Sequence, residues 1–154
     1  MAGASPSTAS TTSTRDPPDH VTYLVDTSAL VRILRRQVHP RWYDQVAAGQ
    51  IAICDPVITE ALAITEPSQT EAVEAGLRAA YPWVPVPADV WETVAAVRRR
   101  LAAAGVHQGL TVADLLVVAI ALSNDLAVLH EDPDFGTAAR YVAELRQERI
   151  TGRG

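Results

Sequence analysis

Several residue types and patterns are scarce or missing in this sequence, and each absence excludes a class of protein. It has one cysteine, Cys54, so no internal disulfide framework can form, and we expect a reducing, cytoplasmic setting. No apolar run reaches the roughly 18 residues of a membrane span, so we expect no membrane partner. Lysine is absent: all 13 positive charges are arginines, which favour planar, bidentate partners such as phosphate or carboxylate.

The remaining composition fits one globular domain. A chain of 154 residues with 48% hydrophobic content can bury a full core. The net charge of −5 argues against a broadly basic nucleic-acid-binding protein, although it leaves a nuclease open. Neither a zinc-ligand spacing among the histidines nor a glycine-rich phosphate loop is present.

The first twenty residues differ from the rest. Positions 1–14 hold eight serines or threonines, and Pro17-Pro18 follow. This segment has no basic start and no apolar core, so a secretory signal is not expected. We interpret residues 1–20 as a disordered leader and 21–154 as the folded domain.

From Val21 onward, short apolar runs alternate with helical patterns, an order typical of βαβ units around a parallel sheet. The apolar runs predict strands near 21–25, 51–54, 84–86, 126–129 and 145–150. The segments between them predict helices at 28–37, 40–48, 56–66, 69–80, 88–104, 111–124 and 133–140. Asp55-Pro56 and Asp132-Pro133 each place an Asp at an N-cap before a proline, and Thr111-x-x-Asp114 resembles a capping box. The sequence therefore predicts an α/β domain.

Four carboxylates stand where strands end or helices begin: Asp26, Glu60, Asp114 and Asp132. Each has an alternative role. The three aspartates can serve as helix caps, and Glu60, a turn inside its helix, can belong to a solvated helix face.

Topology favours a shared site over separate caps. In an open parallel sheet, ligands bind at the edge where strands end and the next helices begin. Asp26 and Asp132 directly follow strands, and Asp114 opens the helix before the last of these strands. Capping by one acid does not explain why the others share that edge. Converging carboxylates form the oxygen-ligand site that Mg²⁺ or Mn²⁺ prefers.

The segments that contain these acids are Tyr-Leu-Val-Asp26-Thr27-Ser28, Pro-Val-Ile-Thr-Glu60, Leu-Thr-Val-Ala-Asp114-Leu-Leu and Leu-His130-Glu-Asp132-Pro-Asp134-Phe. In this order they resemble the PIN-domain ribonucleases, specifically the VapC-type toxins of type II toxin–antitoxin pairs. The similarity extends from Val21 to Ile150.

The resemblance implies a PIN-like α/β/α sandwich with a central parallel sheet, and a metal-dependent endoribonuclease that cuts RNA. It implies that Asp26, Glu60, Asp114 and Asp132 form the Mg²⁺ or Mn²⁺ site, with the hydroxyl of Ser28 or Thr27 beside it. It also implies a VapB-like antitoxin that blocks the site, a homodimer, and a heterotetramer or larger assembly with the antitoxin. Alternatives are a stand-alone RNA-processing nuclease, a PIN-fold interaction module without activity, and a phosphohydrolase.

Some assignments remain open within this family pattern. Glu131 and Asp134 add carboxylates beside Asp132; we favour Asp132 as the fourth ligand, with Asp134 acting through water or supporting it. Arg35 or Arg36 can reach an RNA phosphate, against the alternative of a solvated helix face.

Cys54 and the three tryptophans, Trp42, Trp83 and Trp91, are expected in the core. The alternative for the tryptophans is a protein interface, where exposed aromatics are common anchors.

Overall fold

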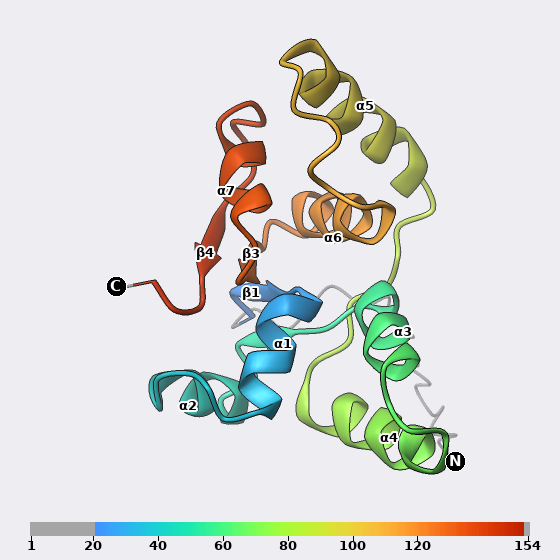
Figure 1. Cartoon of the computed structure of the whole chain (residues 1–154), viewed down its shortest axis with the longest axis vertical. Helices are drawn as coiled ribbons and strands as arrows, with labels where there is room; N and C mark the ends of the chain where they lie inside the picture. Colours follow the sequence, from blue (N-terminus) through green and yellow to red (C-terminus); the bar gives the residue numbers. More distant parts are fainter. Residues whose placement is uncertain (1–20, 153–154) are drawn as a thin grey trace, which may run out of the picture.

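The computed structural model describes residues 21–152, in which helices surround a four-stranded sheet (Figure 1). The strands are β1 (Tyr23–Val25), β2 (Ile51–Ala52), β3 (Ala127–His130) and β4 (Gln147–Arg149). The helices are α1 (Thr27–Leu34), α2 (Arg41–Ala47), α3 (Asp55–Ala63), α4 (Thr70–Ala80), α5 (Val90–Ala103), α6 (Val112–Ser123) and α7 (Pro133–Ala139), with the 3₁₀ helix η1 at Pro67–Gln69. The predicted leader, residues 1–20, lies outside the described residues.

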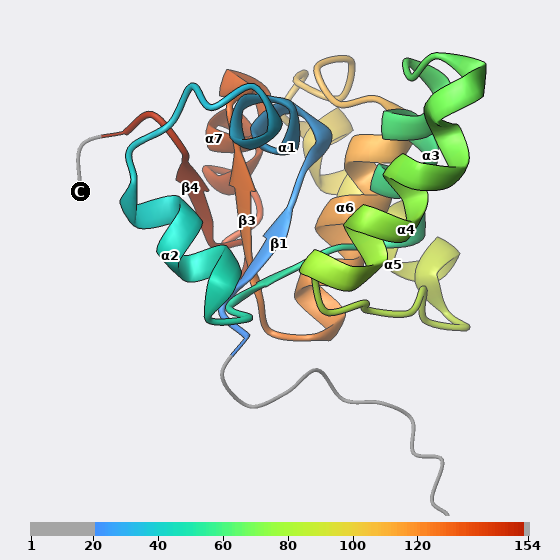
Figure 2. The ribbon, with the colours of Figure 1, turned by 90° about the horizontal axis from the view of Figure 1, so that it is seen from below.

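All four strands are parallel, in the order β2-β1-β3-β4, which confirms the predicted α/β class. Helix α6 packs against β1 and β3 from one side, and α1 packs against β3 from the other (Figure 1). Figure 2 shows β1 and β3 running side by side, with helices on both sides of them. The fold is thus the predicted α/β/α sandwich, and β1 and β3 end at one edge.

Helix α6 is the central helix of the core. Residues 117–121 are all buried, because α5 covers the side of α6 that faces away from the sheet. A helix that is apolar on every side must be buried in this way. Asp114, the third residue of this helix, is itself buried.

The prediction of a full strand at 84–86 is wrong. The structure has only a single parallel bridge, Ile53 with Trp83, in which the Val84 N–H donates to the Ile53 carbonyl at 2.9 Å. Pro85 and Pro87 follow, and neither has an N–H that could continue the ladder.

One predicted helix start is also wrong. Cys54 is the N-cap of α3, so Asp55 is already the first helical residue. The other two signals are confirmed: Asp132 caps α7, and Thr111 forms a capping box with Asp114.

The tryptophans differ in their surroundings. Trp42 is fully buried, and its indole N–H donates to the Ile150 carbonyl at 3.0 Å, which fixes α2 to the chain after β4. Trp83 and Trp91 are 45% and 60% exposed, so the core prediction is wrong for both.

Cys54 is buried as predicted. None of the described helices has the length and apolar character needed to cross a membrane.

Candidate active site

Asp26 stands at the edge where β1 ends. Its backbone N–H donates to the Leu129 carbonyl at 2.9 Å, so the β1 ladder with β3 extends to this residue. One carboxylate oxygen, Oδ2, then caps α1 by accepting from the Ser28 N–H at 3.1 Å and the Ser28 hydroxyl at 2.6 Å. The cap and the candidate ligand are one side chain.

The second oxygen of Asp26 has a different environment. Oδ1 is buried and has no hydrogen-bond partner among the residues that the structure describes. Burial raises the pKa of the Asp26 carboxyl to about 6. The hydrogen bonds from Ser28 lower this pKa, whereas the negative charges of Asp114 and Glu60 raise it. A buried, unpartnered carboxylate oxygen is costly unless a proton or a cation compensates it.

Glu60 comes to the same place from α3. Its Oε1 accepts the hydroxyl of Thr27 at 2.6 Å, so the first residue of α1 holds a side chain from the middle of α3. Glu60 is half-buried, which does not match the alternative of a solvated helix face.

Asp114 is held by the capping box of α6. Its Oδ2 accepts from the Thr111 N–H at 2.9 Å, and its own N–H donates to the Thr111 hydroxyl at 3.1 Å. Burial raises the pKa of the Asp114 carboxyl despite these bonds, and the charges of Asp132 and Glu60 raise it further. Asp114 therefore does cap its helix, as the alternative interpretation proposes. It also lies among the other acids.

Asp132 is positioned by a residue that sequence reasoning did not find. The ring Nδ1 of buried His130 accepts from the Asp132 N–H at 3.1 Å, and the ring Nε2 contacts the amide oxygen of Gln147 on β4. Burial lowers the pKa of His130, which favours a neutral ring able to accept at Nδ1. Only the pairing of β3 with β4 brings Gln147 to His130, so no local sequence signal could have shown this contact.

Glu131 and Asp134, the additional carboxylates, have separate roles. Glu131 accepts from Arg149 Nε at 2.7 Å and from the hydroxyl and N–H of Thr151. Burial raises the pKa of Glu131, but the bonds from Thr151 and Arg149 outweigh it and bring it below its ordinary value. Asp134 packs against Gly109. A side chain at position 109 would be crowded, because its Cβ would lie 3.1 Å from the Asp134 carboxyl carbon. Burial, with the charge of Asp132, raises the pKa of Asp134.

The four predicted acids thus come from separate elements, and their negative charges interact. Asp26 interacts with Asp114 and Glu60, and Asp114 with Glu60 and Asp132. Within residues 21–152, no group of three or more Asp, Glu, His or Cys side chains has the spacing of a metal site. A cation would therefore require these side chains to turn toward one another.

The residues present fit a hard divalent cation. All four candidates offer carboxylate oxygens, which such cations prefer, and buried Asp26 Oδ1 lacks a partner within the described region. By contrast, burial raises the pKa of the Cys54 thiol to about 12, so Cys54 is no nucleophile near neutral pH.

The two arginines predicted to contact phosphate follow the last turn of α1. Arg35 is the C-cap of α1 and lines a groove between α1, α3 and α4. Arg36 is exposed and has a positive φ of 57°, so the chain turns sharply there. Their contact with RNA remains a prediction.

Comparison with known proteins places this arrangement in a family. The PIN domain matches residues 23–141. Ribonuclease VapC6 of Mycobacterium tuberculosis is 41% identical over 70 residues, which are 46% of this chain and 55% of that protein. The match thus spans about half the length of this relative.

Solved structures share the fold at low sequence identity. VapBC-5 from M. tuberculosis is 22% identical with a TM-score of 0.61, covering 84% of this chain and 99% of that one. VapBC2 from Rickettsia felis, bound to a DNA fragment from its promoter, is 14% identical with a TM-score of 0.66, covering 84% and 98%. The match over residues 23–141, together with Asp26, Glu60, Asp114 and Asp132 (the acidic edge), shows that this chain belongs to the PIN domain family.

Proposed function

We propose that this protein is a VapC-type toxin: a Mg²⁺- or Mn²⁺-dependent endoribonuclease that a VapB-like antitoxin neutralises. The observation that carries the proposal is Asp26 Oδ1, which is buried and unpartnered in the described chain at the edge where β1 and β3 end. The charges of Asp114 and Glu60 act on Asp26, and that of Asp132 acts on Asp114. Likeness to VapC6 and to VapBC structures supports the toxin assignment.

The residues divide the chemistry among them. Asp26 and Asp114 would hold the cation directly, while Glu60 and Asp132 would bind its waters or a second ion. When bound, the cation supplies the positive charge that offsets repulsion between the phosphodiester and its nucleophile. Glu60 or Asp132 receives the proton of the attacking water, and Thr27 keeps Glu60 in place through its 2.6 Å hydrogen bond.

The test is cleavage of total cellular RNA by the purified full-length chain. We expect discrete cuts with Mg²⁺ or Mn²⁺, weak cutting with Ca²⁺, whose coordination is longer and looser, and none in excess EDTA. Cleavage that persists in EDTA would overturn the metal-dependent mechanism. An inactive wild-type chain would favour the alternative of an interaction module.

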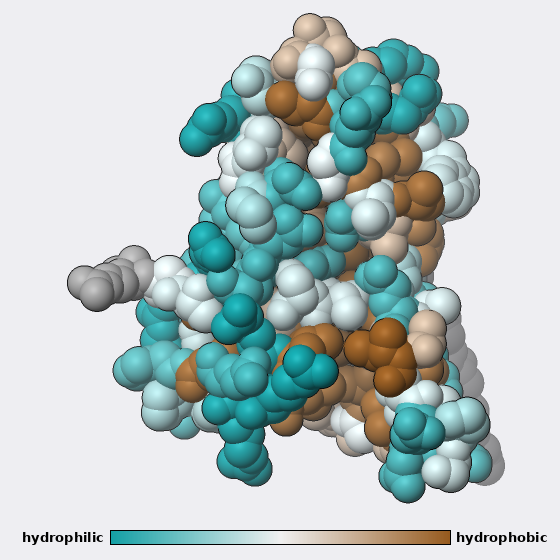
Figure 3. Space-filling model, viewed as in Figure 1, coloured by the Kyte–Doolittle hydropathy of each residue, from teal (hydrophilic) through white to brown (hydrophobic). Residues whose placement is uncertain are grey.

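The antitoxin has a structurally suitable docking place. A groove of about 140 Å³ runs between α1, α3 and α4, with Leu30, Leu34, Ala61, Ile64 and Val73 among its lining residues. Leu34 and Ile64 are 54% and 70% exposed, and Figure 3 shows apolar surface at this place between α1 and α4. An amphipathic helix buries its apolar face in such a groove.

The groove also leads toward the acidic edge, because α1 and α3 meet at the Thr27–Glu60 hydrogen bond. A segment lying in it can therefore extend a basic side chain, such as arginine, into the carboxylates. Inhibition then follows from displacement of the cation. A partner that leaves the acids open to Mn²⁺ would contradict this mode of neutralisation.

A second apolar surface suits the proposed homodimer. A cavity of about 470 Å³ lies between the starts of α3 and α6, lined in part by Val86, Val112 and Leu116. Val112 is 64% exposed, and Trp83 reaches this region by donating to Asp55 at 3.1 Å. Exposed apolar surface of this kind marks an interface.

A further inference from the structure

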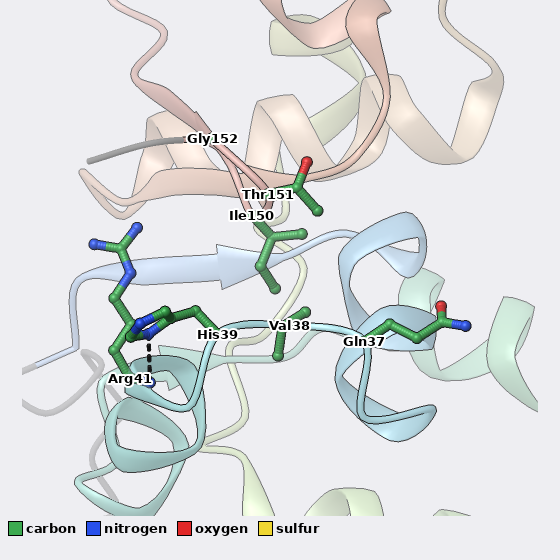
Figure 4. Close-up of a pocket in the computed structure, with 7 residues that line it drawn as sticks. All are labelled: Gln37, Val38, His39, Arg41, Ile150, Thr151 and Gly152. Carbon is green, nitrogen blue, oxygen red and sulfur yellow. Dashed lines mark hydrogen bonds between the residues drawn. The ribbon is translucent and has the colours of Figure 1, made fainter.

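A polar cavity lies beside β4, the outer strand of the sheet, and none of the four acids lines it. Its volume is about 470 Å³, and it opens between the α1–α2 loop and the chain that leaves β4 (Figure 4). Val38 and buried Ile150 supply apolar surface, while Gln37, His39 and Thr151 supply polar groups. An apolar floor with a few polar groups, in a volume of about 300–1,000 Å³, is typical of small-ligand sites.

Hydrogen bonds connect this cavity to the acidic edge. The Ser28 hydroxyl donates to Asp26 at 2.6 Å and accepts from the Glu131 N–H at 2.9 Å. The Glu131 carboxylate in turn accepts the hydroxyl of Thr151, which lines the cavity. Figure 2 shows the α1–α2 loop and the chain after β4 on the side of the molecule toward which β1 and β3 run, and both segments line the cavity. A series of hydrogen bonds therefore links the cavity to Asp26.

The lining side chains have the chemistry to bind a nucleotide. The His39 ring is exposed and accepts the Arg41 N–H at Nδ1, so in the neutral ring Nε2 carries the proton and can donate. An exposed ring also offers a face on which a base can stack.

Arg41 supplies positive charge in a fixed position. Its guanidinium lies 4.6 Å from the centre of the Trp42 ring and 3.5 Å from Oε1 of Glu148, whose other oxygen, Oε2, accepts the hydroxyl of Tyr23. A guanidinium has five N–H donors, so one pairing leaves others for a phosphate. In a protein of net charge −5, a cation held at this cavity favours an anionic strand there.

We propose that this cavity binds a nucleotide of the RNA substrate that flanks the cleaved bond, with the base against His39 and its phosphate toward Arg41. The inference rests on the proposed ribonuclease function and adds to it a place where sequence is recognised. Unstacked bases of single-stranded RNA are what such a pocket can accept, because a paired base cannot leave its helix without cost.

The first test uses the four 5′-mononucleotides as probes. Methyl NMR spectra of the full-length chain, recorded in EDTA, should show saturable shifts of the Val38 and Ile150 signals with at least one nucleotide. The Ile64 and Val73 signals, from the groove between α1, α3 and α4, should stay unchanged and serve as an internal control. No saturable shift at Val38 or Ile150 with any of the four nucleotides would overturn the proposal.

Variants at His39 separate stacking from a structural role. His39→Asn retains an acceptor for the Arg41 N–H but removes the ring, whereas His39→Phe retains a ring without that acceptor. Stacking predicts that Phe keeps the nucleotide-induced shifts and Asn loses them. The reverse order would show that His39 serves only the start of α2, and would overturn the base-binding role. Gln69→Ala, on exposed η1, is the control for loss of a surface polar group.

Cleavage of a randomised single-stranded RNA pool provides the second test. We expect His39→Asn to cut the preferred sequences roughly tenfold more slowly, within the range for loss of one base–ring stack, and to lose the base preference at one flanking position. If the wild type cuts and His39→Asn cuts the same sites equally fast, the pocket proposal fails while the ribonuclease function stands. If the wild type cuts no RNA with either metal, the proposed function fails, and the nucleotide shifts alone decide whether the cavity binds nucleotides.

Discussion

Each of the three aspartates at the candidate site uses one oxygen to cap a helix. Asp26 caps α1, Asp114 closes the capping box of α6, and Asp132 caps α7 by accepting from the Asp134 N–H at 2.9 Å. Within the described chain, these hydrogen bonds reach only one oxygen of each carboxylate. A capping bond fixes the side chain's direction, so the same residues can be rigid caps and oriented ligands.

Asp114→Asn separates these two roles. The Asn side chain still accepts from the Thr111 N–H, but it removes a charge from a pocket of four acids. We expect the metal-free variant to be as stable as the wild type or slightly more stable, because self-repulsion falls. RNA cleavage and stabilisation by Mn²⁺ should be lost together. Thermal melting with and without Mn²⁺, beside a cleavage assay, measures both; full activity with a stability loss of about 1 kcal/mol would show that Asp114 is only a cap.

The raised pKa of Asp26, about 6, gives a pH dependence of known sign. Because the folded pKa lies above the unfolded value of 3.8, the native state binds this proton more tightly. The Asp26 contribution to stability therefore falls as pH rises from about 4 to about 6, by up to about 3 kcal/mol. Urea unfolding in EDTA of the wild type and of Asp26→Asn isolates this term, since other groups titrate in both. A difference between the two that does not change over this range would contradict the assignment.

At the scale of elements, single hydroxyls couple the helices that carry the acids. Thr27 joins α1 to α3 through Glu60, and Ser28 joins α1 to the chain after β3 through Asp26 and the Glu131 N–H. These two hydroxyls thus hold together three segments that are distant in sequence. These bonds determine which oxygens remain directed toward the shared edge.

Thr27→Val tests the coupling of α1 with α3. Valine has a similar shape but cannot donate to Glu60, so we expect a stability loss of about 1 kcal/mol and slower RNA cleavage. In the Glu60→Gln background the same substitution should cost less, because the charge-assisted bond is already weakened. Urea unfolding of the four proteins in this cycle measures the coupling. Additive losses would mean that the bond does not position Glu60.

The element order and the acidic edge could be predicted because they depend on local patterns: apolar runs, Asp-Pro helix starts and the capping box around Asp114. The contacts of His130 with Gln147 and of Glu131 with Thr151 could not, since they arise only when β4 pairs with β3. Trp83 and Trp91 were misjudged for a related reason. Aromatic residues favour burial in general, but which side of a helix, as for Trp91, or of a bridge, as for Trp83, is covered depends on tertiary packing.

For the whole molecule, cation binding should stabilise the fold, because the unfolded chain does not bring the four acids together. We expect millimolar Mg²⁺ or Mn²⁺ to raise the melting temperature of the wild type and to leave Asp114→Asn unchanged. The increase should be larger at pH 7 than at pH 5, since the cation must displace protons from carboxylates whose pKa values are raised. A wild-type melting curve that the cation leaves unchanged at pH 7 would argue against metal binding.

The two exposed apolar surfaces allow a matched test of the proposed partner. Ile64 is 70% exposed in the groove between α1, α3 and α4, and Val112 is 64% exposed near the starts of α3 and α6. Aspartate at either position should leave the fold intact, because neither side chain is in the core. We expect Ile64→Asp to weaken antitoxin binding by roughly 30-fold or more, the effect of losing a hot-spot contact. Val112→Asp should keep antitoxin binding and instead weaken self-association.

The readouts are titration calorimetry with the purified antitoxin, sedimentation of the chain alone, and RNA cleavage in the presence and absence of antitoxin. Ile64→Asp should still cut RNA but escape neutralisation, because its acids are untouched while the antitoxin no longer lies in the groove beside them. If both aspartate variants bound antitoxin like the wild type, the groove would not be the docking place. If Val112→Asp alone escaped neutralisation, the antitoxin would dock on the surface assigned to the homodimer, and the two assignments would have to be exchanged.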